Sequence, residues 1–296
     1  MLLWLVIIIG LLVLFGIRLN PECREISGVN EGEFAVLSEG RVWYELTGEE
    51  TGDLVVLVHG FGTPSGVFKE MVGVLNDAGY RVLRYDLFGR GYSERLELEY
   101  HLEHFVKQLE DLLESLALTR PFTLIGLSMG GTVSAAFGAA NPKRVRNSVL
   151  MAPLVASTDI GLLRYSGLVK VVGPLLARLF PRRQMAGLLK PKGHPDIYAM
   201  VSAQMEVFGT TRGLISIARN IARLDHHRLF EKWGESQIPT LILWGRKDPV
   251  VPFSEHEIAC ELTGAVFEAV SDAGHLALCE KPDEVHEHIL RFLREQ

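Results

Sequence analysis

Short apolar runs recur along the chain from residue 54 onward and are separated by longer segments whose apolar positions have helical spacing. The run LVVLV at 54–58 is apolar on consecutive residues, which is typical of a parallel strand covered by helices on both faces. Runs of this kind lie at 54–58, 81–85, 122–127, 148–152, 241–244 and 265–270. The pattern predicts a doubly wound α/β fold with a mostly parallel sheet.

Two stretches depart from this alternation. Residues 34–46 have the pattern of a hairpin, with Glu39 and Gly40 at the turn between two short strands. Residues 154–232 contain helical patches and no convincing strand. We therefore expect a core in two parts, 34–153 and 233–296, interrupted by a helical insertion.

The chain starts with an apolar run from Leu2 to Ile17, 16 residues long. As a helix it would span roughly 24 Å, against about 30 Å for the hydrocarbon core of a membrane. A secreted protein with a cleaved signal peptide is the alternative, but no basic residue precedes the run and no small-x-small cleavage site follows it. We expect a single-pass membrane anchor at 1–19 and a linker at 20–33.

Charge is distributed unevenly. The whole chain has a net charge of -6, which argues against a nucleic-acid partner, whereas residues 154–232 contain 12 Lys and Arg against 5 Asp and Glu. Because Arg18 and Arg24 follow the apolar run, the positive-inside rule places the following domain on the cytoplasmic side. The three cysteines are scattered and no HExxH spacing occurs, so we expect neither a metal nor another cofactor.

Ser128 stands between two glycines, in the sequence GLSMG at 126–130, directly after an apolar run. A hydroxyl becomes a good nucleophile when a base takes its proton and when it stands clear of the backbone. The pattern G-x-S-x-G between a strand and a helix gives that clearance, because glycine at 126 and 130 tolerates the crowding of a sharp turn. A passive serine in a glycine-rich turn is the alternative.

A carboxylate and an imidazole follow later strands in the order that this motif requires. Asp248 comes after the run at 241–244, and His275 after the run at 265–270. Catalytic groups in such sheets gather at the carboxyl ends of the strands, so we expect these side chains to meet Ser128. Ser128 would attack, His275 would transfer its proton, and Asp248 would hold the imidazole tautomer. We expect Asp272 to shape the same loop instead.

Acyl transfer also needs hydrogen-bond donors for the negative charge that develops on the carbonyl oxygen. The expected donors are the backbone N–H groups of Met129 and Phe61, the latter in the loop after the first core strand. We expect His59 to brace that loop. The other histidines lie in polar segments and are expected to be exposed: His101, His104, His194, His226, His227, His256, His286 and His288.

Four blocks of sequence together resemble the α/β-hydrolase family. They are LVHGFG (57–62), RYDLFGRGYSE (84–94), GLSMGG (126–131) and WGRKDPVVP with AGHLALCEKPDEV (244–252 and 273–285). The resemblance implies the α/β-hydrolase fold. It also implies that Ser128, Asp248 and His275 are catalytic and that Phe61 and Met129 form the oxyanion hole.

The same resemblance implies that residues 154–232 are a lid inserted after the sixth strand. The block at 84–94 is similar to a structural turn of the family. We expect Asp86 and Arg90 to pair and hold this turn, and Ser93 is a weaker candidate for catalysis.

The apolar N-terminus and the basic, leucine-rich insertion favour a lipid-like substrate, since cationic amphipathic segments bind anionic membrane surfaces. We expect a serine hydrolase of monoacyl esters, similar to monoacylglycerol lipases. General carboxylesterases stay open, as do carbon–carbon bond hydrolases and perhydrolases with the same triad. A non-catalytic, membrane-bound binding module is the alternative of another class.

Overall fold

A computed structural model of the chain describes residues 31–156 and 194–296. Within these ranges the chain forms a sheet in the order β1-β2-β4-β3-β5-β6-β7-β8. The strands are β1 (Glu33–Val36), β2 (Arg41–Thr47), β3 (Leu54–Val58), β4 (Arg81–Tyr85), β5 (Phe122–Leu127), β6 (Val145–Met151), β7 (Thr240–Gly245) and β8 (Val266–Val270). Strands β3 to β8 are parallel, and β1 and β2 are antiparallel to their neighbours.

Each of the six apolar runs from residue 54 onward forms a strand, and the prediction of a mostly parallel, doubly wound sheet is confirmed. The hairpin is also confirmed, since β1 and β2 pair directly and Leu37 N donates to Gly40 O at 3.0 Å across the turn. Strand ends differ from the predicted ends by a few residues. The largest difference is at β6, which begins at Val145 instead of residue 148.

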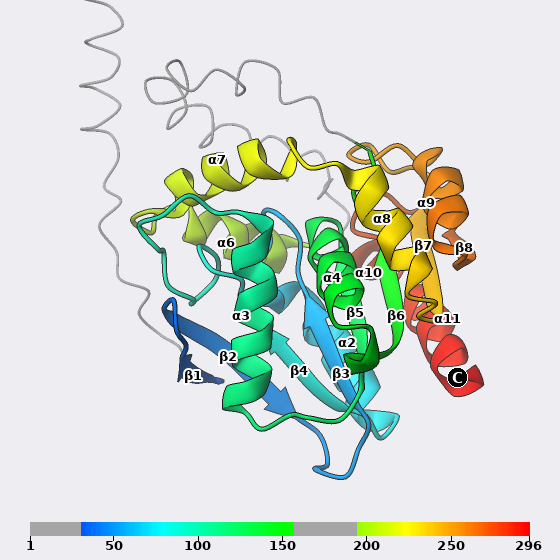
Figure 1. Cartoon of the computed structure of the whole chain (residues 1–296), viewed down its shortest axis with the longest axis horizontal. Coiled ribbons are helices and arrows are strands. Elements are labelled where there is room, and N and C mark those ends of the chain that lie inside the picture. The colour runs from blue at the N-terminus through cyan, green and yellow to red at the C-terminus, as the bar shows by residue number, and fades with distance from the viewer. Residues whose placement is uncertain (1–30, 157–193) are drawn as a thin grey trace, which may run out of the picture.

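Helices cover both faces of the sheet (Figure 1). One face packs against α3 (Leu102–Ser115), α4 (Met129–Ala140), α8 (His226–Glu235) and α9 (Glu255–Thr263). The other packs against η1 (Ser65–Phe68), α2 (Lys69–Asp77), α10 (Ala277–Glu280) and α11 (Pro282–Glu295). In β3, Val56 and Val58 belong to the first core and Val55 and Leu57 to the second, all fully buried. Two covered faces explain why this strand is apolar at every position.

The described part of the insertion after β6 is helical and contains α6 (Pro195–Gln204) and α7 (Thr210–Ile221). These helices lie over the edge of the sheet at which its parallel strands end, called here the carboxyl edge (Figure 1). Hydrogen bonds join them to the segment after β4: Gly91 N donates to Gln204 Oε1 at 2.6 Å, and Tyr100 N to Ser216 Oγ at 2.8 Å.

The predicted end of the insertion, residue 232, falls inside α8. Trp233 of this helix is fully buried, and its Nε1 donates to Thr240 Oγ1 at 3.0 Å. The indole occupies the space above Gly138 of α4, where a Cβ would lie 2.2 Å from its Cζ3 atom. Helix α8 is therefore anchored in the core beside α4 through Trp233.

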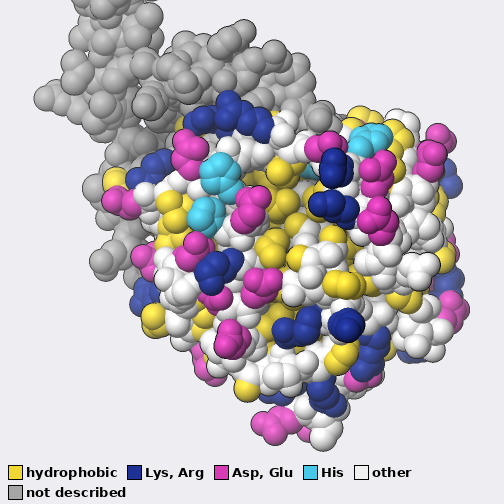
Figure 2. Space-filling view, viewed as in Figure 1, with side chains coloured by type: hydrophobic (Ala, Val, Ile, Leu, Met, Phe, Trp, Pro, Cys, Tyr) yellow, Lys and Arg dark blue, Asp and Glu magenta, His cyan; other side chains and the backbone are white. Residues whose placement is uncertain are grey.

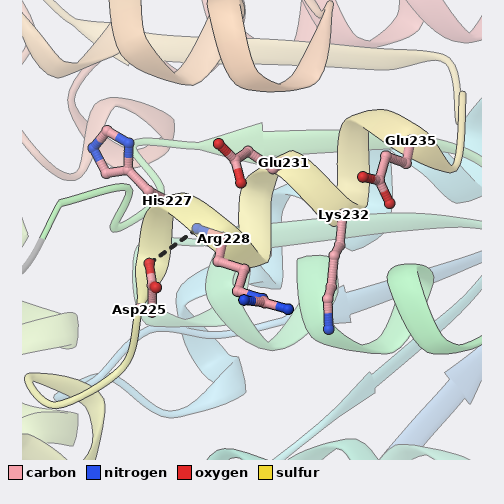
Figure 3. Close-up of a pocket in the computed structure, with 6 residues that line it drawn as sticks. All are labelled: Asp225, His227, Arg228, Glu231, Lys232 and Glu235. Carbon is pink, nitrogen blue, oxygen red and sulfur yellow. Dashed lines mark hydrogen bonds between the residues drawn. The ribbon is translucent and has the colours of Figure 1, made fainter.

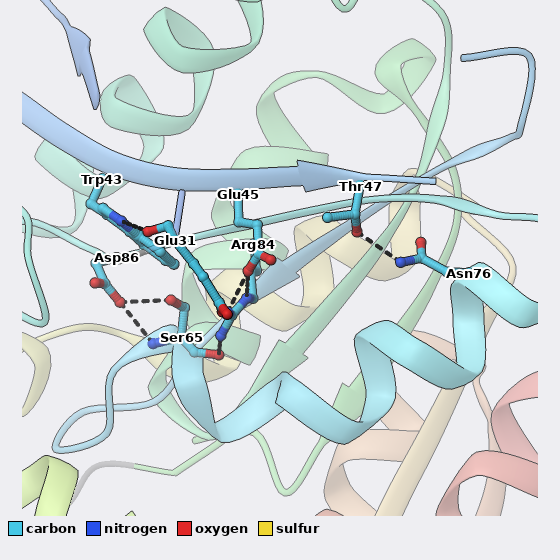
Figure 4. Close-up of polar contacts among 8 residues, drawn as sticks. All are labelled: Glu31, Trp43, Glu45, Thr47, Ser65, Asn76, Arg84 and Asp86. Atoms are coloured by element: carbon cyan, nitrogen blue, oxygen red, sulfur yellow. Dashed lines mark hydrogen bonds and ion pairs between the residues drawn. The ribbon is translucent and has the colours of Figure 1, made fainter. Parts of the chain in front are cut away.

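Buried polar contacts join the antiparallel end of the sheet to the loop after β3 (Figure 4). Arg84 of β4 pairs with Glu45, its direct neighbour on β2, and both side chains are largely buried. Asn76 Nδ2 of α2 donates to Thr47 Oγ1 at 2.8 Å. These contacts fix β2 against β4 and α2, and Arg84 NH1 also donates to Ser65 O at 3.4 Å, where the loop after β3 ends.

The predicted anchor at 1–19 and most of the linker at 20–33 lie outside the described residues, as does the stretch 157–193 of the predicted lid. No helix in the described ranges combines the length and apolar character that a membrane span requires. On the face shown in Figure 2, acidic and basic side chains are interspersed.

Candidate active site

Ser128 lies at a sharp turn between β5 and α4. Its backbone has φ 54° and ψ -120°, a combination that residues with a side chain rarely adopt. The turn is held from both sides, because Ser128 N donates to Met151 O at 2.8 Å and Gly131 N donates to Ser128 O at 2.8 Å. Strained backbone at a residue in this position is the geometry of a nucleophile elbow.

The glycines on either side of Ser128 are required by close backbone approach. A Cβ at Gly126 would lie 2.5 Å from Gly130 O, and a Cβ at Gly130 would lie 2.1 Å from Val58 O at the end of β3. Both distances are far shorter than a van der Waals contact. The sequence-based reason for the two glycines, crowding at the turn, is confirmed.

Asp248 and His275 form a pair. His275 Nδ1 lies 2.8 Å from Asp248 Oδ2, and the two side chains are 6% and 0% exposed. Asp248 Oδ1 accepts hydrogen bonds from Val250 N at 2.8 Å and Val251 N at 3.0 Å. The carboxylate is thereby fixed with one oxygen toward the ring. It accepts the Nδ1 proton and leaves His275 Nε2 as the basic nitrogen.

The turns that carry Asp248 and His275 are joined to each other through their backbones. Lys247 N donates to Ala273 O at 2.8 Å, and Arg246 N donates to Val270 O at 3.1 Å. Asp272 does not contact the imidazole: its exposed carboxylate pairs with Lys247 Nζ at 2.6 Å. As expected from the sequence, Asp272 shapes the loop and Asp248 faces the ring.

Ser128, Asp248 and His275 follow β5, β7 and β8, whose carboxyl ends lie at one edge of the parallel sheet. The structure brings Asp248 and His275 into contact. Ser128 Oγ makes no hydrogen bond with the other described residues, and its assignment as the nucleophile rests on the elbow. Catalytic hydrogen bonds often form fully only once substrate is bound.

Both predicted oxyanion donors lie beside the elbow. Met129 is the first residue of α4, where a backbone N–H has no acceptor within its own helix. Phe61 is in the loop after β3, and β3 is the direct neighbour of β5, with Val58 opposite Gly126. The two loops therefore leave the sheet side by side. The donor role of each N–H stays a prediction.

His59 braces the loop after β3. Its ring is fully buried; Nε2 accepts from Leu87 N at 2.9 Å, and Nδ1 lies 2.9 Å from Gly60 O. Burial lowers the pKa of His59 to about 4, so the ring is neutral near pH 7. The expectation that His59 supports the loop is confirmed.

The predicted pair between Asp86 and Arg90 is wrong. Asp86 Oδ1 accepts from Ser65 N at 2.8 Å and from Ser65 Oγ at 2.7 Å, and Oδ2 accepts from Tyr92 N at 2.8 Å. Arg90 Nε donates instead to Phe61 O at 2.6 Å. Ser65 and Tyr92 occupy both oxygens of the Asp86 carboxylate, and the Arg90 guanidinium reaches a carbonyl of the loop after β3 instead.

Ser93, the weaker candidate for catalysis, has a structural contact on each side of its hydroxyl. The Oγ donates to Asp86 O at 2.6 Å and accepts from Trp43 N at 3.0 Å, and the side chain is 1% exposed. These bonds tie the turn after β4 to β2.

Two of the histidines expected to be exposed are buried. His226 is 1% and His286 is 8% exposed, and His226 Nε2 lies 2.9 Å from Ile221 O. Burial lowers the pKa of both rings. Each lies on the inward face of an amphipathic helix, α8 or α11. Its neighbours in the sequence are mostly polar, but the side chain itself is buried.

A pocket of about 530 Å³ lies along α8 (Figure 3). It is lined by side chains of both charges: Asp225, His227, Arg228, Glu231, Lys232 and Glu235. None of these comes from the turns that carry Ser128, Asp248 or His275. Among the described residues, no cluster of His, Cys, Asp and Glu side chains is arranged to hold a metal ion.

Known proteins are similar to this chain in sequence and in fold. Over 272 residues it is 29% identical to a dihydrolipoyllysine-residue acetyltransferase component of an acetoin cleaving system from Pseudomonas putida, covering 85% of this chain and 66% of that protein. With Lipase 1 from Psychrobacter immobilis the identity is 26%, covering 91% and 86%. The structure of a thermophilic esterase from Thermogutta terrifontis is similar with a TM-score of 0.76 and 27% identity, covering 90% and 98%.

A family model described as serine aminopeptidase, S33, matches residues 49–281. That range includes the loop after β3, the Ser128 elbow and the turns of Asp248 and His275. The sheet order, the elbow and the Asp248–His275 pair agree with the match. The chain belongs to the α/β-hydrolase family.

Proposed function

We propose that the protein is a serine hydrolase that cleaves carboxylic esters through an acyl-enzyme on Ser128. The observation that carries the proposal is the buried Asp248–His275 pair, which lies at the same edge of the sheet as a strained serine elbow. A relative named as a lipase and a solved structure named as an esterase support it.

In the proposed reaction, Ser128 Oγ attacks the ester carbon while its proton passes to His275 Nε2. Asp248 stabilises the imidazolium, and the N–H groups of Phe61 and Met129 bind the oxyanion. The tetrahedral intermediate then loses the alcohol, which takes the proton from His275. Water repeats the sequence on the acyl-enzyme: it gives a proton to His275, releases the carboxylic acid and restores the Ser128 hydroxyl.

A direct test uses Ser128→Ala with a p-nitrophenyl ester and a fluorophosphonate probe. The wild-type protein is expected to hydrolyse the ester and to be labelled, and the variant to do neither. Because the probe reacts with an activated serine whatever the natural substrate, labelling tests the nucleophile by itself. Labelling of the variant to the wild-type level would contradict the assignment. Labelling of the wild type without ester hydrolysis would favour a carbon–carbon bond hydrolase or perhydrolase.

We further propose that the natural ester is lipid-like and carries a single acyl chain. The apolar run at 2–17 supports a location at a membrane, and the basic insertion supports contact with anionic headgroups. A panel of monoacylglycerols and soluble esters of rising chain length, presented with and without anionic vesicles, tests this substrate class. Preference for longer chains in vesicles is expected, and equal rates on short soluble esters would contradict it.

The membrane location is proposed separately, with the N-terminal run as a single-pass anchor. The full chain should stay in the membrane pellet after a carbonate wash, and a variant without residues 1–19 should move to the supernatant. Release of the full chain, or a mature N-terminus beyond residue 20, would contradict the anchor.

A further inference from the structure

The loop that carries the predicted donor Phe61 is held at three points by the turn after β4. His59 Nε2 accepts from Leu87 N at 2.9 Å at one end of the loop, and Ser65 donates to Asp86 at the other. The middle contact is the one from Arg90 Nε to Phe61 O at 2.6 Å. Of the three, only the Arg90 contact acts on the donor residue itself.

Arg90 is unusual because it is a charged residue in a buried position. Its side chain is 1% exposed, and burial lowers the pKa of its guanidinium to about 9. NH1 donates to Gly89 O at 2.8 Å, and NH2 has no hydrogen-bond partner among the described residues. No carboxylate of the described residues forms a salt bridge with it. A buried cation with only carbonyl acceptors is costly for stability, so its presence calls for another advantage.

Its contacts with Phe61 supply such an advantage. Besides the hydrogen bond to the carbonyl, the guanidinium carbon lies 5.5 Å from the centre of the Phe61 ring. The carbonyl and the N–H of one residue belong to adjoining peptide planes, which are linked only through its φ and ψ. Holding both the carbonyl and the ring of Phe61 therefore restrains the direction of its N–H.

We propose that Arg90 is a positioning residue, which keeps the Phe61 N–H aimed at the oxyanion that forms during ester cleavage. The proposal rests on the serine hydrolase function proposed above. Preorganised donors stabilise a transition state because they need no rearrangement at the moment of reaction. A donor that is free to turn loses that benefit while the substrate still binds.

Arg95 provides a matched control in the same turn. It is also largely buried, and its NH1 donates to Gly91 O and Ser93 O, both at 2.6 Å, and to Arg90 O at 3.4 Å, while Nε donates to Thr210 Oγ1 at 3.2 Å. Within the described residues, none of its hydrogen bonds reaches the loop after β3. Replacing Arg95 removes a buried guanidinium from the turn without touching Phe61.

The test compares Arg90→Met and Arg95→Met in the full chain. We expect Arg90→Met to lower kcat by about 10- to 100-fold with KM changed less than about twofold, as for a small misplacement of a catalytic donor. The affinity for a trifluoromethyl ketone, which adds Ser128 to form an oxyanion, should fall by the same factor. Arg95→Met should lower the melting temperature and leave kcat and ketone affinity within about threefold of wild type.

Either of two results would overturn the proposal: wild-type kcat in Arg90→Met, or an equal loss of kcat in Arg95→Met. If Arg90→Met does not fold, Arg90→Lys serves in its place, since lysine keeps the charge and lacks the planar guanidinium. Wild-type kcat in Arg90→Lys would also overturn the proposal. A wild-type protein that neither reacts with a fluorophosphonate nor cleaves esters would instead refute the proposed function.

Discussion

Asp248 Oδ2 lies 2.8 Å from His275 Nδ1, although the two residues are 27 positions apart in the sequence. The second carboxylate oxygen is occupied by two backbone N–H groups, and the two turns are joined by hydrogen bonds of their own. The ring orientation is thus set by a rigid acceptor. This relationship selects Asp248 as the acid, although Asp272 is much closer to His275 in sequence.

Asp248→Asn should lower kcat by about 10³- to 10⁴-fold with little loss of stability. The amide oxygen can still accept from Val250 and Val251, which turns the NH₂ group toward His275 Nδ1. The proton of the ring then moves to Nε2, the nitrogen that must act as base. Steady-state kinetics on a p-nitrophenyl ester measure the loss.

Asp272→Asn is the control for that variant, because it removes only an exposed ion pair with Lys247. Its kcat should stay within about twofold of wild type, as expected for a surface pair. Equal losses in both variants would show that the loop, and not the acid, sets the rate.

Gly130→Ala should destabilise the fold by at least about 3 kcal/mol, because the new Cβ would lie 2.1 Å from Val58 O and neither backbone can move far. Gly73→Ala is the matched control: Gly73 is exposed within α2, and a Cβ there would meet nothing within 4 Å. It should gain about 0.5 to 1 kcal/mol. Urea denaturation measures both, and a stable Gly130→Ala protein would contradict the crowding argument.

Stability should fall in mild acid because of His59. Its pKa is about 4 in the folded protein and 6.5 in the unfolded chain, so between these values the unfolded chain binds a proton that the folded protein does not. The free energy of unfolding should therefore be unaffected by His59 above pH 7. It should fall by on the order of 2 to 3 kcal/mol as the pH drops from 6.5 to 4.

His226 and His286 act in the same direction, since burial lowers the pKa of each. The contribution of His59 is accordingly the difference between wild type and His59→Gln, measured by urea denaturation across this pH range. A variant with the same pH dependence as wild type would contradict the assignment.

Ser93→Ala should retain kcat within about threefold and lose about 1 to 3 kcal/mol of stability. The hydroxyl accepts from the buried Trp43 N, and removing it leaves that donor unsatisfied. A joint measurement of kcat and urea stability separates this structural role from catalysis. Loss of activity at full stability would return Ser93 to the catalytic candidates.

The strands and the elbow could be predicted because their signals are local. A strand covered on both faces must be apolar at each position, as in Val55 to Val58, and an elbow needs its two glycines wherever it occurs. The order of Ser128, Asp248 and His275 then sufficed to place them at one edge, since parallel strands end on the same side.

Contacts that depend on packing could not be predicted in this way. Asp86 and Arg90 are four residues apart and opposite in charge, which suggested a pair, but the fold places Ser65 at the carboxylate and Phe61 at the guanidinium. Likewise, the polar residues around His226 gave no sign that its own helix turns that position toward the core. Ser65 and Phe61 come from a segment distant in sequence from Asp86 and Arg90, and the burial of His226 depends on how α8 packs against the core.

Helix α8 begins at His226, with Asp225 accepting from Arg228 N at its start, and carries Trp233 into the core beside α4. Recombination between related hydrolases, natural or designed, therefore has a suitable junction ahead of Asp225 and an unsuitable one at residue 232. A transplant that ended at residue 232 would join the first turns of a foreign helix to Trp233, whose side chain packs against Gly138 of this protein. One that stops before Asp225 exchanges the insertion as a unit and leaves the supporting architecture of the recipient intact.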